Sequence, residues 1–122
     1  MTDWTDDQLD WIGGAIELAI APRRPDGSLR PFITVWVVRA GRGLYVRSWR
    51  GPTGRWFTAA RRTGAGRIRA GGVEAAVAFQ PADDLERRAV DAAYRDKHGR
   101  SSDVAAMVGD AAAATTLRLV PR

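Results

Sequence analysis

The segment from Phe32 to Val38 constrains the fold most, because both of its alternating sets of side chains are apolar. One set is Ile33, Val35 and Val37, the other is Phe32, Trp36 and Val38, and only Thr34 interrupts the run. Successive side chains of a strand point to opposite faces of a sheet, so this strand should be covered on both faces. We therefore expect it to lie in the core of a β-barrel or β-sandwich.

Glycine-rich turns after this segment predict a meander of antiparallel strands. Gly41-Arg42-Gly43 reverses the chain into a partner strand, and Gly71-Gly72 is a strong signal for a two-residue hairpin. About six strands are expected in all, at residues 15–21, 32–38, 44–49, 67–70, 73–79 and 115–120.

Helices are expected at the periphery of these strands. The first has Thr5 as its N-cap, carries two aspartates at its positive end and stops at Gly13-Gly14. A longer helix begins after Asp83, closes at residues 97–99, and should cover the barrel with its apolar face. The expected apolar contacts are Leu9, Trp11 and Ile12 in the first helix and Leu85, Ala89, Ala92 and Ala93 in the second. Shorter helical segments are expected at residues 56–60 and 101–107.

Length and composition indicate one domain that spans residues 1–122. No apolar run approaches the roughly 18 residues that a membrane span requires, and the acidic N-terminus is unlike a signal peptide, so we expect a cytoplasmic protein. The chain has no cysteine and a single histidine, His98, which excludes thiolate nucleophiles, Cys-ligated metals and sites that need two imidazoles. No metal site is expected, and His98 is interpreted as a helix cap.

The distribution of charge is more informative than the net charge of +5. Between Gly27 and Val73 the chain has no Asp or Glu, but it has ten arginines: Arg30, Arg39, Arg42, Arg47, Arg50, Arg55, Arg61, Arg62, Arg67 and Arg69. These arginines could simply lie on solvated strand faces. A segment this one-sided repels itself, however, and the planar guanidinium binds phosphate and carboxylate in a bidentate manner. We therefore predict an anionic ligand or partner.

The block at residues 44–51, followed by Arg55-Trp56-Phe57 and Arg61-Arg62, offers the donors that bind a phosphate. A strand that ends in Arg, Ser and Arg beside a helix start supplies guanidinium, hydroxyl and free backbone N–H groups together. Neighbouring aromatics could stack on a flat ring. Trp36, Trp49 and Trp56 are nevertheless interpreted as core residues rather than as a stacking platform.

Several motifs resemble an uncharacterised bacterial family, domain of unknown function 2255, over nearly the whole chain. They are residues 26–30 before 34–38, residues 44–48 with Gly51, residues 56–60, residues 92–99, and residues 115–119 with Pro121. That family is in turn similar to the flavin-binding split β-barrels, which include pyridoxamine phosphate oxidases and deazaflavin-dependent reductases. The resemblance implies a mainly β (α+β) fold, an antiparallel split β-barrel of about six strands with peripheral helices.

The resemblance also implies a function and a site. Relatives of this kind form homodimers and hold FMN or the deazaflavin F420 in a cleft at the interface, and the cofactor carries the hydride chemistry. Carried over by position, the phosphate candidates are Arg47, Ser48, Arg50, Arg61 and Arg62, with Trp56 as a neighbour of the ring. The stretch Gly-Arg-Lys-Ser-Gly of the deazaflavin reductases is absent, and only Arg30 stands near its place.

Two other interpretations remain open from the sequence. Tyr45, Arg47 and Trp49 share one face of an expected strand, and this mixture of stacking and charge is typical of single-strand nucleic-acid binders. Alternatively, the protein is a non-catalytic interaction domain whose arginines pair with the acidic helices of a partner subunit. Alternation fixes the face of a side chain but not what covers it, so the sequence leaves open whether the arginines line a pocket or face solvent.

Overall fold

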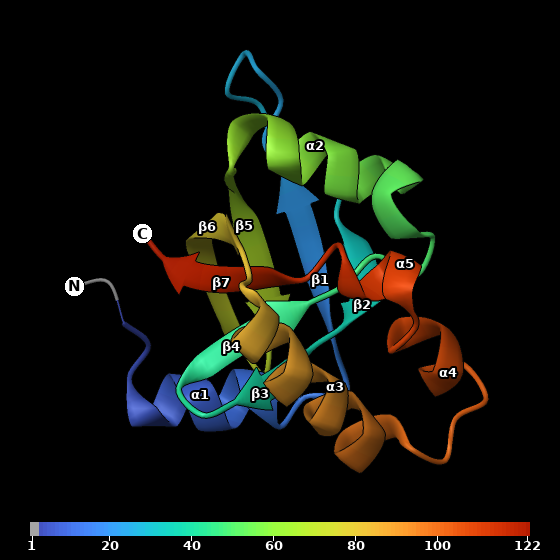
Figure 1. Cartoon of the computed structure of the whole chain (residues 1–122). Helices are drawn as coiled ribbons and strands as arrows, with labels where there is room; N and C mark the ends of the chain where they lie inside the picture. Colours follow the sequence, from blue (N-terminus) through green and yellow to red (C-terminus); the bar gives the residue numbers. More distant parts are fainter. Residues whose placement is uncertain (1–2) are drawn as a thin grey trace.

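The computed structural model describes residues 3–122, and within them seven strands form one antiparallel sheet that curls into a nearly closed barrel (Figure 1). The strands are β1 (Glu17–Pro22), β2 (Ile33–Trp36), β3 (Val38–Ala40), β4 (Gly43–Val46), β5 (Ala65–Ala70), β6 (Val73–Pro81) and β7 (Leu117–Pro121). Their order in the sheet is β2-β1-β5-β6-β7-β4-β3, and every neighbouring pair is antiparallel. The expected mainly β split barrel is confirmed, with seven strands rather than about six.

The extra strand arises because the apolar segment at 32–38 is not one strand. β2 ends at Trp36 and β3 begins at Val38, yet these two strands form opposite edges of the sheet. The two apolar sets pack into different clusters: Val35 and Val37 contact the core inside the barrel, whereas Trp36 and Val38 contact the core under the long helix. Coverage on both faces therefore holds for residues 35–38, whereas Ile33 and Thr34 are exposed.

The helices surround the barrel. They are α1 (Asp6–Gly13), the 3₁₀ turn η1 (Gly51–Thr53), α2 (Arg55–Thr63), α3 (Asp84–His98), α4 (Val104–Met107) and α5 (Asp110–Ala113). The expected N-cap at Thr5 is present and forms a capping box with Gln8, and α3 begins after Asp83 as expected, where Asp83 and Glu86 form another capping box. The short helix α5 was not expected. None of the helices in the described part of the chain is long and apolar enough to cross a membrane.

Helix α3 covers the sheet as expected, but of the four apolar contacts predicted for it only Ala93 packs against the core. The helix buries Val90, Tyr94 and His98, which follow one another at intervals of four residues, and it leaves Leu85 76% exposed. Ala89 and Ala92 are exposed as well, because they lie off this stripe. In α1, Leu9 and Ile12 are buried as expected, but Trp11 is 54% exposed.

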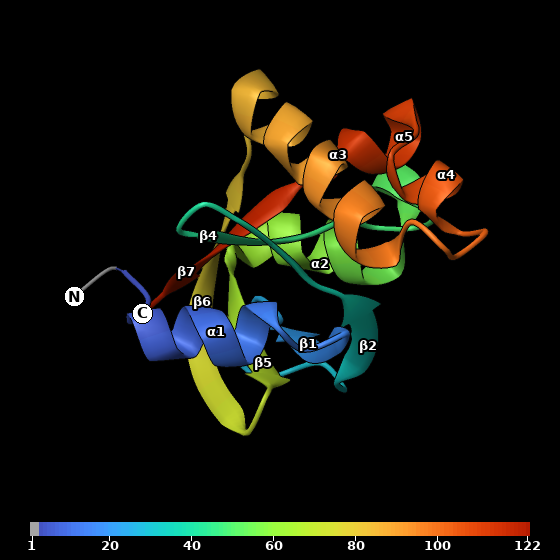
Figure 2. The same ribbon diagram turned by 90° about the horizontal axis from the view of Figure 1, so that it is seen from below.

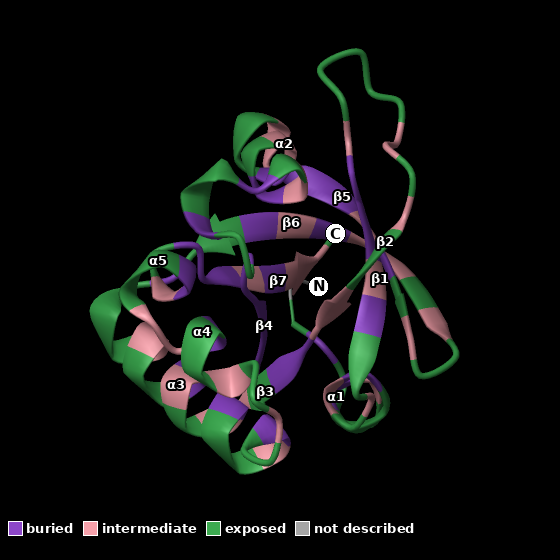
Figure 3. Cartoon of the chain, turned by 90° about the vertical axis from the view of Figure 1, so that its right-hand side faces the viewer, coloured by how far each residue is buried: buried purple, intermediate pink, exposed green. Residues whose placement is uncertain are grey.

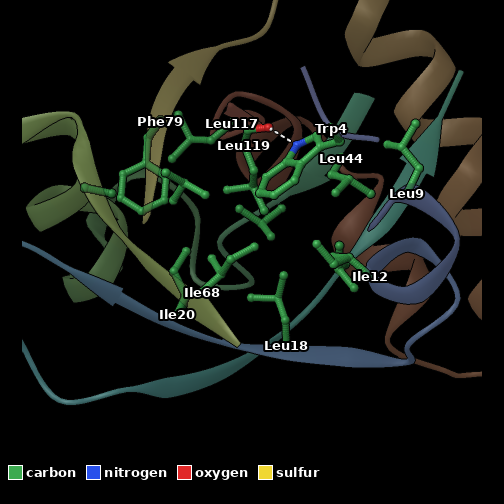
Figure 4. Close-up of a cluster of buried hydrophobic side chains, with 14 of the residues drawn as sticks. Trp4, Leu9, Ile12, Leu18, Ile20, Leu44, Ile68, Phe79, Leu117 and Leu119 are labelled. Carbon is green, nitrogen blue, oxygen red and sulfur yellow. Dashed lines mark hydrogen bonds between the residues drawn. The ribbon is translucent and has the colours of Figure 1, made fainter. Parts of the chain in front are cut away.

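Two hydrophobic clusters make up the core. The larger one fills the barrel, where the Trp4 indole N–H donates a hydrogen bond to the carbonyl of Leu119 at 2.8 Å (Figure 4). The smaller one joins α3 to the outside of the sheet and contains Val38, Tyr45 and Tyr94. Strands β3 and β4 lie between α1 and α3, and their buried residues run through the middle of the molecule (Figures 2 and 3).

Two connections fix the path of the chain between strands. Gly71 and Gly72 have φ values of 54° and 80°, so they form the expected hairpin turn in which Ala70 pairs with Val73. At the joint between β2 and β3, the Lys97 ammonium donates to the carbonyls of Val37 at 2.7 Å and Gly13 at 2.8 Å, and also to that of Ala15. Lys97 therefore ties α3 to both the joint and the end of α1.

Candidate functional site

A cavity of about 590 Å³ opens beside the edge strand β2. Its walls come from residues 34–36 of β2, residues 47–50 after β4, residues 54–56 at the start of α2, and from Glu17, Asp103 and Met107. We call it the tryptophan cavity, because Trp36, Trp49 and Trp56 all line it. Its volume lies within the roughly 300–1,000 Å³ that is usual for small-molecule sites.

The three tryptophans all present aromatic surface at this cavity, and two of them also pack against the core. Trp49 is 60% exposed, and Trp36 and Trp56 are half-buried. Trp36 is fixed from behind by His98, whose ring stacks on it with centroids 4.0 Å apart and planes at 3°. Trp56 packs edge-to-face on Phe57, with centroids 6.2 Å apart. The interpretation as core was therefore wrong for Trp49, whereas Trp36 and Trp56 pack against the core clusters and also line the cavity.

Arg47 also belongs to the cavity wall, but its side chain is engaged within the protein. Its side chain is fully buried, and Nε donates to the Thr116 hydroxyl at 2.8 Å while Nη1 donates to Asp91 Oδ1 at 2.5 Å. Further hydrogen bonds reach the carbonyls of Met107 at 2.9 Å and Arg87 at 3.0 Å. This phosphate candidate thus joins the end of β4 to α3, α4 and the start of β7, and most of its donors are already engaged.

Ser48 is placed differently, because its buried hydroxyl has no hydrogen-bond partner among residues 3–122. Its backbone N–H donates to the Thr115 hydroxyl at 2.8 Å, which fixes the residue in the wall. The hydroxyl lies against Gly54, where a Cβ would come within 2.3 Å of Ser48 Oγ. Only a glycine at position 54 lets this hydroxyl lie so close to the start of α2.

The start of α2 adds backbone donors to the hydroxyl. Gly54 is its N-cap, and no side chain within the described chain caps this terminus. The first N–H groups of a helix have no acceptor within the helix, and the helix dipole favours an anion there. Arg50 and Arg55 are exposed and line the same cavity. Glu17 and Asp103 line it too, so its side-chain charge is mixed.

The remaining phosphate candidates do not join this cavity. Arg61 is exposed, and its guanidinium lies 6.0 Å from the centroid of the Phe57 ring. Arg62 lines a second cavity on the other side of α2. The structure therefore brings Ser48, Arg50 and Trp56 together around one space, with Arg47 in the same wall, and separates them from Arg61 and Arg62.

The expected stacking face for nucleic acid is not on the surface. Tyr45 and Arg47 are 3% and 1% exposed, and β4 ends at Val46, before Trp49. The Tyr45 hydroxyl donates to Glu86 at 2.6 Å, and burial with this hydrogen bond raises the pKa of Tyr45 to about 12. This part of the nucleic-acid interpretation was wrong, because α3 covers the face.

Sequence reasoning missed Gly54, named Arg55 only as part of the phosphate-binding block, and assigned Trp36 to the core alone. The signal for the first two was the run Gly51-Pro52-Thr53-Gly54, which breaks the strand and leaves the next helix without a capping side chain. Nothing local marks Trp36, because His98, which orients it, is 62 residues away (98 minus 36). His98 itself is buried at the end of α3, so its interpretation as a simple helix cap was incomplete.

Comparison with solved structures supports the fold. A structure described as an F420 reductase superposes with a TM-score of 0.59 at 13% sequence identity, and the match covers 98% of this chain and 94% of that chain. At such low identity the likeness shows a shared fold. The comparison with curated protein sequences gave no match.

The sequence comparison with protein families gives the more specific result. Residues 8–119 match the family described as "Uncharacterized protein conserved in bacteria (DUF2255)". The match includes the arginines of both cavities and all of the strands except the last two residues of β7. The chain therefore belongs to this bacterial family, as the resemblance of its motifs predicted.

Proposed function

We propose that this protein binds a flavin or deazaflavin, of the FMN or F420 type, in the tryptophan cavity and acts as a cofactor-dependent reductase. One observation carries the proposal: the unpartnered hydroxyl of Ser48 lies against the uncapped start of α2, in the wall of a cavity with three tryptophans. The fold shared with an F420 reductase is consistent with it.

The residues present fit the phosphate end of such a cofactor. A buried hydroxyl without a partner is costly, by about 1–3 kcal/mol, and a phosphate oxygen would satisfy it. The backbone N–H groups at the start of α2 add further donors, and Arg50 and Arg55 can approach from the exposed side. In this assignment Arg47 is a positioning residue that holds the Ser48 backbone in place.

The residues also fit the ring end. Trp36 is held by its stack on His98, and Trp49 and Trp56 supply further aromatic faces, so a flat ring would be held and shielded from water on several sides. The bound cofactor would supply the hydride chemistry. The chain's own residues bind the cofactor and orient it, which is consistent with the lack of a nucleophile and its base in the cavity wall.

A thermal-shift titration with FMN, F420 and haem, together with the visible absorbance of the purified protein, tests the proposal. Trp49→Ala removes an exposed wall residue of the cavity, and Trp11→Ala is the matched control because Trp11 is similarly exposed at a distant helix. We expect a saturable rise in Tm with FMN or F420 in the wild type and in the control. At about 100 times Kd the ligand should add ~2.7 kcal/mol to the free energy of unfolding.

The Trp49→Ala variant should require a higher ligand concentration for the same rise. Absence of colour and of any shift with FMN or F420 would contradict the proposal, and a shift with haem alone would redirect it to another cofactor. We also propose that the protein is a homodimer, as the resemblance implies. Light scattering coupled to gel filtration would measure its mass against the 13.3 kDa of one chain.

A further inference from the structure

A second cavity, of about 320 Å³, lies on the other side of α2 and is lined by arginines. They are Arg23, Arg24, Arg30, Arg55 and Arg62. The other residues in its lining are proline, threonine and alanine, and no carboxylate is among them. We call this space the arginine cavity.

The fold brings these arginines together from two segments. On α2, Arg55 and Arg62 lie seven residues apart, which places them on one face of the helix. The others belong to the loop between β1 and β2, which projects beside α2 in Figure 1. This loop is anchored at its base, because Arg23 N–H donates to the Ala65 carbonyl at 2.9 Å and the Thr63 hydroxyl donates to the Arg23 carbonyl at 2.9 Å.

The loop also orients its own arginines. Arg23 Nη1 donates to the Gly27 carbonyl at 2.7 Å, and Arg24 Nη1 donates to the Leu29 carbonyl at 2.8 Å. Hydrogen bonds from Ser28 to Asp26 lower the pKa of that carboxyl and stabilise the tip of the loop. These guanidinium groups are thus held in place before any ligand arrives.

Unlike several other arginines in the described part of the chain, these five form no ion pair. Elsewhere Arg42 pairs with Asp6 at 2.7 Å, and Arg67 and Arg69 share Glu74. In the part of the chain that the structure describes, none of the five forms an ion pair with a carboxylate, and the side chains of three make no hydrogen bond at all: Arg30, Arg55 and Arg62. Five like charges around one space repel one another, so an anion placed there would be strongly favoured.

We propose that the arginine cavity binds a small anion that carries two or more phosphate or carboxylate groups. A guanidinium makes bidentate contacts with either group. One singly charged group cannot pair with all five arginines, so a ligand with several anionic groups fits the cavity better. The two cavities share Arg55 in their linings. The site nevertheless stands on its own contacts, whatever the tryptophan cavity binds.

Isothermal titration calorimetry with tripolyphosphate and with citrate, at fixed ionic strength, tests the site. The double variant Arg30→Gln/Arg62→Gln removes two side chains that hold nothing else in the described chain. The control Arg88→Gln/Arg95→Gln removes the same charge from exposed positions of α3. We expect saturable binding to the wild type, at least about tenfold weaker binding to the cavity variant, and a change of less than about twofold in the control.

The two probes distinguish which anionic group the cavity prefers. Tighter binding of tripolyphosphate identifies a phosphate ligand, and tighter binding of citrate identifies a carboxylate ligand. No saturable binding of either, or an equal loss in both double variants, would overturn the proposal. Binding of a single-stranded oligonucleotide without binding of either small anion would overturn it as well, in favour of a nucleic-acid surface. Trp49→Ala should leave anion binding unchanged, which separates this site from the cofactor proposal.

Discussion

Replacing Ser48 by alanine should make the ligand-free protein more stable and at the same time weaken cofactor binding. The hydroxyl of Ser48 is buried and has no partner within residues 3–122, and such a group costs about 1–3 kcal/mol of folding free energy. Alanine removes this hydroxyl but keeps the backbone N–H that donates to Thr115. We therefore expect the free energy of unfolding to rise by about 1 kcal/mol.

For a chain of this length, a gain of about 1 kcal/mol corresponds to a rise in Tm of roughly 3–6 °C. The effect on binding has the opposite sign. A hydrogen bond to a charged phosphate contributes about 1.5–3 kcal/mol, so Ser48→Ala should raise the Kd for FMN or F420 at least about tenfold. Urea denaturation of the ligand-free protein and a fluorescence titration with the cofactor measure the two quantities separately.

Ser102→Ala is the matched control, because Ser102 is exposed, and it should change neither quantity. A loss of stability in Ser48→Ala would mean that the hydroxyl is satisfied in the ligand-free protein. Unchanged cofactor affinity would refute its assignment to the phosphate.

Three further predictions concern other contacts. Arg47→Met should lower the free energy of unfolding, measured by urea denaturation, by about 2–4 kcal/mol, because it leaves Asp91 without its partner. A loss under about 1 kcal/mol would contradict the supporting role of Arg47. Burial and the charge of Lys97 lower the pKa of His98 below 6.5, so the folded state binds fewer protons than the unfolded state. The free energy of unfolding should therefore fall as the pH drops below 6.5, and an unchanged pH dependence in His98→Gln would refute this cause. Gly64 ends α2 at a φ of 68°, with open space around it. Gly64→Ala should therefore lower the free energy of unfolding by about 1 kcal/mol, seen as a lower Tm, whereas an unchanged Tm would show that the helix end relaxes.

Features that depend on neighbours in sequence could be predicted. The N-cap at Thr5, the helix start after Asp83 and the glycine turn at Gly71-Gly72 all follow from a few adjacent residues, and all are confirmed, whereas α2 extends beyond the expected residues 56–60 at both ends. The split barrel was predicted as well, because the resemblance supplied the topology that periodicity alone leaves open.

Features that depend on distant partners could not be predicted. An apolar run at 32–38 reads as one strand, and nothing in its alternation marks the joint at Val37 where the chain passes from one edge of the sheet to the other. Arg47 shows the same limit: its partners Asp91 and Thr116 lie 44 and 69 residues away, so its burial is invisible from the strand that it follows. In the candidate site, the sequence identified Ser48, Arg50 and Trp56 as candidates, but the β1–β2 loop brings Arg62 into a different cavity with Arg23, Arg24 and Arg30.

The joint at Val37 also determines where this backbone can be cut. The first and last parts of the described chain are neighbours, since Trp4 donates a hydrogen bond to Leu119, so a circular permutant that links the termini is geometrically feasible. New termini in the exposed turn at Gly27 would leave every strand pair intact. New termini at Val37 would remove the covalent link between the two edge strands at the point that Lys97 holds, and a loosened edge strand is prone to pair with other chains.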